Sequence, residues 1–84
     1  MAMTKKQKLD HLDHALKTLQ DIADKVGYHI DSDPDYIELV NQATDWQFGC
    51  IRMNKDNRLK MELLHRAVTN RVYAVGACEA PLHR

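Results

Sequence analysis

An apolar repeat with alternating steps of three and four residues occurs twice in this chain of 84 residues and constrains its fold more than any other feature. Steps of three and four keep every member of a series on one stripe of an α-helix. Two such helices, joined by a turn-rich segment, are expected to pack against each other through these stripes. The first series is Leu9, Leu12, Leu16, Leu19, Ala23 and Val26, and the second is Tyr36, Leu39, Ala43, Trp46, Cys50 and Met53.

Helix-start and helix-end signals flank the first series. Thr4 followed by Gln7 fits a capping box, in which the hydroxyl and the amide satisfy free backbone N–H groups. Gly27, directly after the series, can supply the left-handed residue that ends a helix. These signals predict a helix over residues 4–26.

A start signal also precedes the second series. The carboxylate of Asp33 is suited to cap a helix, and Pro34 at the first helical position loses no hydrogen bond. The apolar series then predicts a helix over residues 34–53. Gly49 interrupts it and marks either a close helix crossing or, alternatively, a kink or helix end.

The second predicted helix has a broad apolar surface. Additional apolar residues flank its main stripe, so the apolar arc spans roughly 220° on a helical wheel. The third predicted helix covers part of this arc, and we expect a second copy of the chain to cover the rest, which makes the protein a homo-oligomer. Cys50 on the main stripe is expected to be a buried small hydrophobic residue. The candidate interface residues are Tyr36, Ile37, Val40, Trp46, Phe48, Ile51 and Met53.

A third apolar series predicts a helix over residues 58–75, which Gly76 is expected to end. Residues 77–84 are then expected to form a mobile tail. In an alternative α+β fold, residues 48–63 form a hairpin, because they alternate apolar and polar positions around a turn. Good helix formers dominate this segment, so we favour an all-α, antiparallel three-helix bundle.

Length and composition limit the fold and its partners. Eighty-four residues make a single domain, 1–84, that buries only about 60–65% of its unfolded surface, so we expect dimerisation to complete it. Twelve basic residues balance twelve acidic ones, which argues against a general polyanion binder. The sequence shows no secretory signal, no apolar run of membrane-spanning length and no disulfide framework, so we expect a cytoplasmic protein without a membrane partner.

The charges are distributed unevenly along the chain. Residues 31–50 carry five acids and no Lys or Arg, whereas residues 51–84 carry seven bases and three acids. The acidic middle and the basic end are expected to meet, within one molecule or between two. The charged residues that are candidates for contact with a partner are Arg52, Lys55, Arg58, Arg66 and Arg71.

Two histidine patterns have the spacing of metal ligands. His11 and His14 share a helix face, but that face is the charged one, which lacks the closed shell of a structural metal site. Glu62 and His65 form a single Glu-x-x-His element, whereas di-iron bundles need two, with further inward glutamates. We therefore expect no metal, no cofactor and no catalytic residue.

Arg58 and His65, separated by six residues, form the one pattern that suggests an enzyme. This spacing resembles the Arg-x4–6-His signature of HEPN domains, which are small helical ribonucleases. The resemblance implies that the arginine would grip a phosphate, that the histidine would act on the ribose 2′-hydroxyl, and that paired subunits would build the site. Leu59 stands where that pattern usually has a polar residue.

A second resemblance involves residues 64–68, Leu-His-Arg-Ala-Val, with Asp56 upstream. This segment is similar to the second-helix motif of phage hairpin proteins that sequester cyclic-nucleotide immune signals. The resemblance implies an oligomer that traps a small anionic ligand in a cationic pocket.

The function that the sequence favours is non-enzymatic binding or regulation, in which a homo-oligomeric helical scaffold acts on a macromolecular partner, such as a protein. Nucleic acid is a weaker alternative, because the basic side chains of the third helix point in four different sectors. Small accessory proteins of phages, plasmids and other mobile elements have this character, which is an analogy only. The HEPN-like ribonuclease and the ligand-trapping oligomer are the alternatives.

Overall fold

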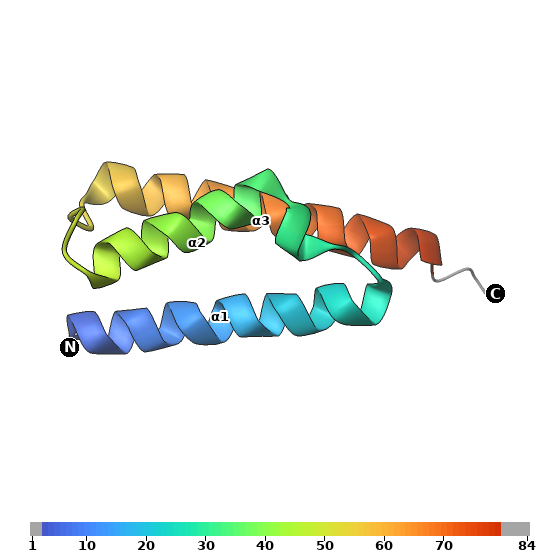
Figure 1. Cartoon of the computed structure of the whole chain (residues 1–84), viewed down its shortest axis with the longest axis horizontal. Helices are drawn as coiled ribbons and strands as arrows, with labels where there is room; N and C mark the ends of the chain where they lie inside the picture. The colour runs from blue at the N-terminus through green and yellow to red at the C-terminus, as the bar shows by residue number, and fades with distance from the viewer. Residues whose placement is uncertain (1–2, 80–84) are drawn as a thin grey trace.

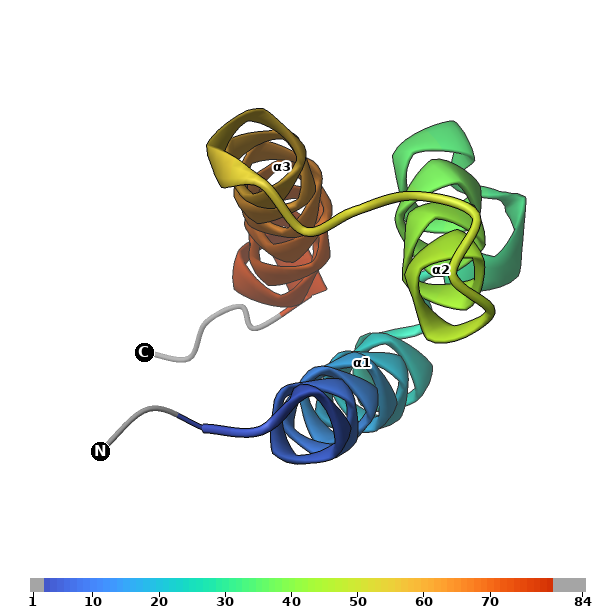
Figure 2. The same cartoon turned by 90° about the vertical axis from the view of Figure 1, so that its left-hand side faces the viewer.

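The computed structural model describes residues 3–79, which form three α-helices and one short 3-10 helix. The elements are α1 (Lys5–Val26), η1 (Ile30–Ser32), α2 (Pro34–Gln47) and α3 (Lys55–Glu79). The chain runs up, down and up, so α2 is antiparallel to α1 and α3 (Figure 1), and the helices occupy the corners of a triangle when seen along the bundle (Figure 2). The predicted all-α three-helix bundle is confirmed for the described residues, within which no strand occurs.

The helix α1 begins and ends as its local sequence predicts. Thr4 Oγ1 accepts a hydrogen bond from the backbone N–H of Gln7 (3.2 Å), and Gln7 Oε1 accepts one from the N–H of Thr4 (3.0 Å). At the other end, Gly27 adopts a left-handed φ of 79°, and the N–H of Tyr28 donates to the carbonyl of Ala23 (2.8 Å). This Schellman-type end satisfies carbonyls that would otherwise lack a partner.

The helix α2 starts at Pro34 as predicted but ends at Gln47, so the prediction that it continues to residue 53 is wrong. Gly49 adopts a left-handed φ of 77°, and the N–H of Cys50 donates to the carbonyl of Asp45 (2.7 Å). This is the same hydrogen-bonded ending that closes α1. The glycine therefore ends the helix, which was the alternative to a close helix crossing.

The early end of α2 removes the broad apolar arc that the sequence suggested. Ile51 and Met53 follow the helix in a connection, where both are half-buried. Cys50 is exposed, which contradicts its predicted burial as a small hydrophobic residue. Phe48 is 73% exposed beside the left-handed turn, because its position lies outside the packed part of the helix.

The helix α3 is longer at both ends than the predicted span of 58–75. It begins at Lys55, because the side chain of Asn54 caps it by accepting a hydrogen bond from the N–H of Asn57 (2.9 Å). It passes through Gly76 and reaches Glu79, so this glycine does not end it. Residues 77–79 of the predicted tail are thus helical, and residues 80–84 lie outside the described residues. The helix also excludes a hairpin over 48–63.

The core lies along the axis between the three helices. Its buried members come from all four elements and are Leu16, Leu19, Ala23, Ile30, Tyr36, Leu39, Met61, Val68 and Val72. Trp46 is also buried, with 7% of its surface exposed. Tyr36 and Trp46, which the sequence offered as interface residues, therefore lie inside the molecule. Of the other five candidates, Ile37 and Phe48 are exposed and Val40, Ile51 and Met53 are half-buried.

Candidate functional site

A groove of about 1000 Å³ lies between α1 and α3, and we call it the α1–α3 groove. Its apolar lining includes Leu12 and Ala15 of α1, Met53 of the connection, and Met61 of α3. Trp46 of α2 also lines it. The groove thus has an apolar floor to which every helix contributes.

The spacing of α1 and α3 explains why the groove lies near the start of α1. At the far end of α1, Gly76 lies so close to Val26 that an added Cβ would come within 3.0 Å of its Cγ1 atom. The glycine therefore permits a tight helix crossing there. Near the start of α1, Leu9 and Leu12 are only half-buried, so the bundle is less tightly closed at that end.

The rim of the groove is mainly basic. Lys8 of α1 and Lys55, Arg58 and Arg66 of α3 give four cations, and Glu62 is the one acid in the lining, so its formal charge is +3 (four minus one) with neutral histidines. The remaining polar lining is His11, Asn54, His65 and Thr69. An apolar floor under a basic rim suits a ligand that is both apolar and anionic.

Helical spacing brings the polar lining of α3 together. Arg58, Glu62, His65 and Thr69 follow one another at steps of four, three and four, which place them on one side of the helix facing α1. This polar stripe was the sequence signal for the groove. The polar stripe was not predicted, because Arg58, Lys60, Arg66 and Arg71 point in different sectors when the basic residues alone are compared.

Arg58 and His65 line the same groove, as the HEPN resemblance requires. His65 is half-buried, and its backbone carbonyl accepts a hydrogen bond from the hydroxyl of Thr69 (2.7 Å). His11 of α1 contributes a second imidazole to the lining. His14 is exposed and does not line the groove.

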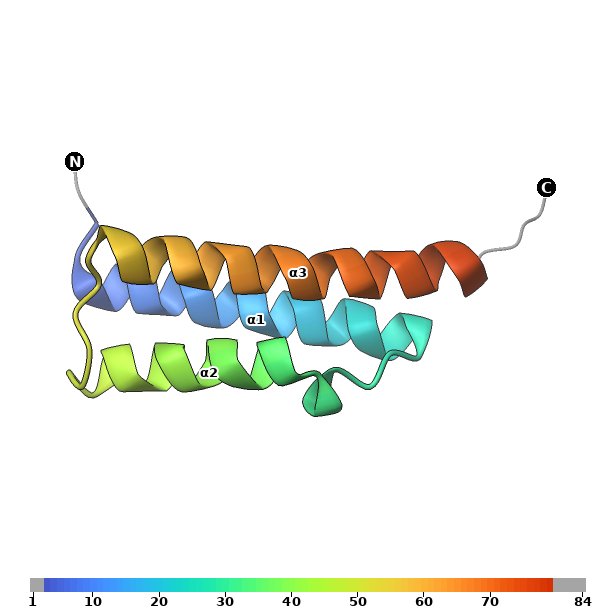
Figure 3. The same cartoon turned by 90° about the horizontal axis from the view of Figure 1, so that it is seen from above.

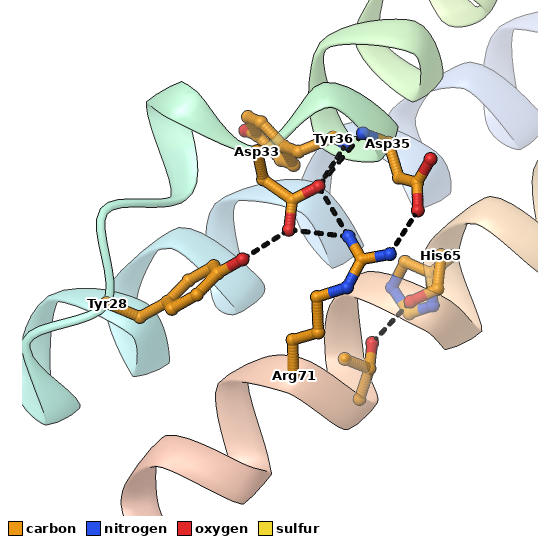
Figure 4. Close-up of polar contacts among 7 residues, drawn as sticks. Tyr28, Asp33, Asp35, Tyr36, His65 and Arg71 are labelled. Carbon is orange, nitrogen blue, oxygen red and sulfur yellow. Dashed lines mark hydrogen bonds and ion pairs between the residues drawn. The ribbon is translucent and has the colours of Figure 1, made fainter.

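The candidate charged surface is divided by the fold. Lys55, Arg58 and Arg66 converge on the groove, whereas Arg52 is exposed outside it. Arg71 instead binds carboxylates at the start of α2 (Figure 4). Three of the five basic candidates are therefore available together at one place.

The contacts of Arg71 define a second polar site, which we call the Asp33 cluster and which consists of Tyr28, Asp33, Asp35 and Arg71 (Figure 4). Arg71 Nη1 donates to Asp33 Oδ1 (2.8 Å) and Oδ2 (2.9 Å), and Nη2 donates to Asp35 Oδ2 (2.6 Å). The hydroxyl of Tyr28 also donates to Asp33 Oδ2. The Asp33 side chain is fully buried, with 0% exposed, and its contacts connect the segment after α1 and the start of α2 to α3.

Hydrogen bonds set the protonation of this cluster. Burial alone would raise the pKa of the Asp33 carboxyl, but donors on Tyr28, Arg71 and the backbone outweigh burial and hold that pKa below its usual value. The hydrogen bond to Asp33, with burial, raises the pKa of the Tyr28 hydroxyl. Asp33 also accepts from the N–H groups of Asp35 (2.9 Å) and Tyr36 (3.3 Å), so the cluster caps α2. Its saturated contacts indicate a structural role.

The predicted meeting of acidic and basic segments therefore occurs within one molecule. Besides the Asp33 cluster, Lys60 Nζ of α3 lies 3.0 Å from Glu38 Oε2 of α2. Both contacts lie on the α2 side of α3, opposite to the groove side.

Residues 3–79 contain neither a metal-ligand cluster nor a membrane-spanning helix. No group of three His, Cys, Asp or Glu side chains there could hold a metal ion. In the same stretch, no helix has the length and apolar character needed to span a bilayer.

Comparisons with protein-family models, curated proteins and solved structures gave no match to this chain. The α1–α3 groove and the surfaces around it are the features of this chain that bear on its function.

Proposed function

We propose that the protein is a small non-enzymatic binding protein that holds an acidic, amphipathic helix of a partner protein in the α1–α3 groove and that acts as a homodimer. The observation that carries this proposal is the basic rim over an apolar floor, with a formal charge of +3 from four cations and one acid. The chain as a whole has a net charge of zero, so the excess is local to the groove.

The floor supports a helical ligand because its side chains are large and adaptable. Met53 and Met61 are flexible and polarizable, and the buried Trp46 adds apolar bulk at the base of the groove. Amphipathic helices bind grooves of this kind by inserting apolar residues at steps of three and four. Acidic residues on the flanks of such a helix would lie beside Lys8, Lys55 and Arg58.

The same floor argues against nucleic acid as the main partner. Surfaces that follow a phosphate backbone are polar and rich in cations, and sites for single strands add aromatic residues that are exposed for base stacking. The tryptophan here is 7% exposed and packs from below as part of the floor.

Titration with a designed acidic helical peptide tests the proposal. Trp46 is the only tryptophan of the chain and lines the groove, so its fluorescence reports occupancy directly. We expect binding of a peptide with alternating Leu and Glu faces, and none of the same peptide with Lys in place of Glu. Equal binding of both peptides, or of neither, would contradict the proposal.

Charge reversals locate the binding site. Arg58→Glu and Lys8→Glu should each weaken binding of the acidic peptide by about tenfold or more, since they turn an attractive rim charge into a repulsive one. Arg52→Glu is the matched control, because Arg52 is exposed outside the groove. If the control weakens binding equally, only the total charge matters and the groove is not the site.

A HEPN-like ribonuclease is a second candidate, favoured by the convergence of Arg58 and His65 on one groove. The test is RNA cleavage in the presence of EDTA by the wild-type protein, Arg58→Ala and His65→Ala. We expect any cleavage to be the same in all three. A reproducible activity that both substitutions abolish would make the ribonuclease the better assignment.

A trap for a small anion has less support. That function needs an enclosed cationic cavity, whereas Lys8, Arg58 and Arg66 stand exposed along the rim of an open groove.

A further inference from the structure

A second stripe of residues runs along the outer face of α3. Its members follow at steps of four, three, four, three and four, and all of them are exposed: Leu59, Leu63, Arg66, Asn70, Tyr73 and Ala77. The buried residues Met61, Val68 and Val72 lie on the opposite side of the same helix. The helix therefore has two apolar faces, and the core of the bundle covers only one of them.

The outer stripe exposes much of its apolar surface. Leu59, Leu63 and Tyr73 are 54%, 53% and 56% exposed, and they are three of the six large hydrophobic residues exposed within residues 3–79. Both α1 and α2 lie on one side of α3 (Figure 2), and the free side extends along the whole helix (Figure 3). A concentration of exposed apolar residues on one face is typical of an interaction surface.

The spacing indicates what kind of element covers this face. Alternating steps of four and three are the seam positions of a coiled coil, where a second helix packs side chains between those of the first. From Leu59 to Ala77 the stripe is about 27 Å long at 1.5 Å per residue. Ala67 and Ala74 flank it on the α2 side, and their small side chains leave room for close approach.

The sequence of the stripe is complementary to itself in the antiparallel direction. In a two-fold antiparallel pair centred on position 68, residues whose numbers sum to 136 face each other. Leu63 then faces Tyr73 of the partner subunit, and Arg66 faces Asn70 of the partner subunit. Leu59 faces the partner's Ala77, a large residue against a small one.

A parallel pair of α3 helices would be less stable. It would place Arg66 against Arg66 of the partner subunit in the seam, where two like charges repel each other and lose hydration. In the antiparallel pair the same guanidinium meets an amide that can accept its hydrogen bond. A single polar layer of this kind fixes the register and direction of paired helices.

We propose that a second copy of this chain covers the outer face of α3, through an antiparallel helix pair centred near Val68. The inference rests on the homodimer in the proposed function, and it shares one residue with the groove, because Arg66 lies at the edge between the groove rim and the stripe. It also moves the contact from the predicted residues of α2 to α3. Tyr36 and Trp46 are buried in the fold, whereas all six members of the stripe are exposed.

The test introduces one charge on each side of the Leu63–Tyr73 layer. Leu63→Glu and Tyr73→Lys should each raise the dimer dissociation constant by at least about tenfold, because each homodimer would carry two uncompensated charges in its seam. Mixing the two variants should restore a heterodimer, which has one Glu–Lys layer and one native Leu–Tyr layer. Sedimentation velocity measures all three species.

The control is Ile37→Glu, which places the same charge on an exposed apolar residue of α2. It should leave the dimer constant unchanged, and circular dichroism should show native helix content for every variant, since all three positions are exposed.

Each outcome decides a separate question. A wild-type protein that stays monomeric up to millimolar concentration would overturn both this contact and the proposed homodimer. A dimer unaffected by Leu63→Glu would keep the homodimer but overturn the contact. Variants that dissociate alone and fail to associate when mixed would overturn the antiparallel register.

Discussion

The two ends of the bundle are stabilised by different means, and the difference separates what holds the fold from what is available for binding. At the end of α1, Val26 packs against Gly76, and the nearby Asp33 cluster has its polar atoms paired. At the start of α1 the packing is open, the charges are mostly of one sign, and a groove remains. The paired charges of the Asp33 cluster hold the fold together, whereas the basic rim over an apolar floor suits a ligand.

Among the substitutions that test this contrast, Trp46→Ala should have the largest effect on stability. Because the indole is 7% exposed and lies beneath the open end, its removal should lower the free energy of unfolding by about 3–5 kcal/mol. Thermal and urea unfolding followed by circular dichroism measure the loss. If the variant stays folded with native stability and loses only peptide binding, the open end serves the ligand alone.

At the other end, Asp33→Ala should lower the free energy of unfolding by about 2–4 kcal/mol, because it removes the cap of α2 and leaves the Tyr28 hydroxyl and Arg71 Nη1 without an acceptor. The control is Asp35→Ala, which breaks a partly exposed ion pair and should cost only about 0–1 kcal/mol. If both variants lose the same free energy of unfolding, the burial of the Asp33 carboxylate does not add to stability.

The Asp33 cluster also predicts how stability depends on pH. The pKa of Asp33 in the folded protein is below its unfolded value of about 3.9. Asp33 therefore adds to the free energy of unfolding above about pH 3.9, and this stabilisation is lost as the pH falls through the folded pKa. The pKa of Tyr28 is raised in the folded protein. Tyr28 therefore adds to the free energy of unfolding below about pH 10, and this stabilisation is lost as the pH rises through the folded pKa. Urea unfolding from pH 2 to 11 should show both losses, and Asp33→Asn should reduce both.

A smaller effect is expected at the close helix crossing. Gly76→Leu should cost about 1–3 kcal/mol, since the new side chain would overlap Val26. Val26→Ala in the same chain should recover part of this loss, because it frees the space. No recovery in the double variant would mean that the two positions do not limit the approach of α1 and α3.

The smallest expected effect is that of salt on self-association. The proposed seam contains apolar residues and an Arg–Asn layer but no ion pair, so the dimer constant should change less than about tenfold between 50 mM and 1 M salt. Analytical ultracentrifugation checks this. A change of several orders of magnitude would mean that charges carry the contact and that the open, basic end takes part in it.

The three glycines show how much of the fold could be predicted from the sequence. Gly27 was assigned correctly because a capping signal and the end of an apolar series coincide there. Gly49 ends α2 by the same hydrogen bonds, but the apolar series continues past it and concealed the end. Gly76 was expected to end α3 and does not, because its contact is with Val26, fifty positions away (76 minus 26). Local signals could not contain that information.

The candidate sites also combine features that local sequence predicts with features that depend on contacts between distant residues. The grouping of Arg58, Glu62, His65 and Thr69 on one side of α3 could be predicted from helical spacing, but which residues of α1 lie opposite depends on how the helices pack. The pairing of Arg71 with Asp33 joins positions 38 apart, and only the general meeting of acidic and basic segments was foreseen.

The Asp33 carboxylate has a consequence for how the chain folds. Capping normally helps a helix to start from its own neighbourhood, but here the capping oxygens also hold side chains from α3 and from the end of α1. With only 14 residues, α2 is too short to be stable alone in water. A peptide of residues 33–47 should therefore be largely unstructured, and α2 should form only together with the other two helices, in one cooperative transition.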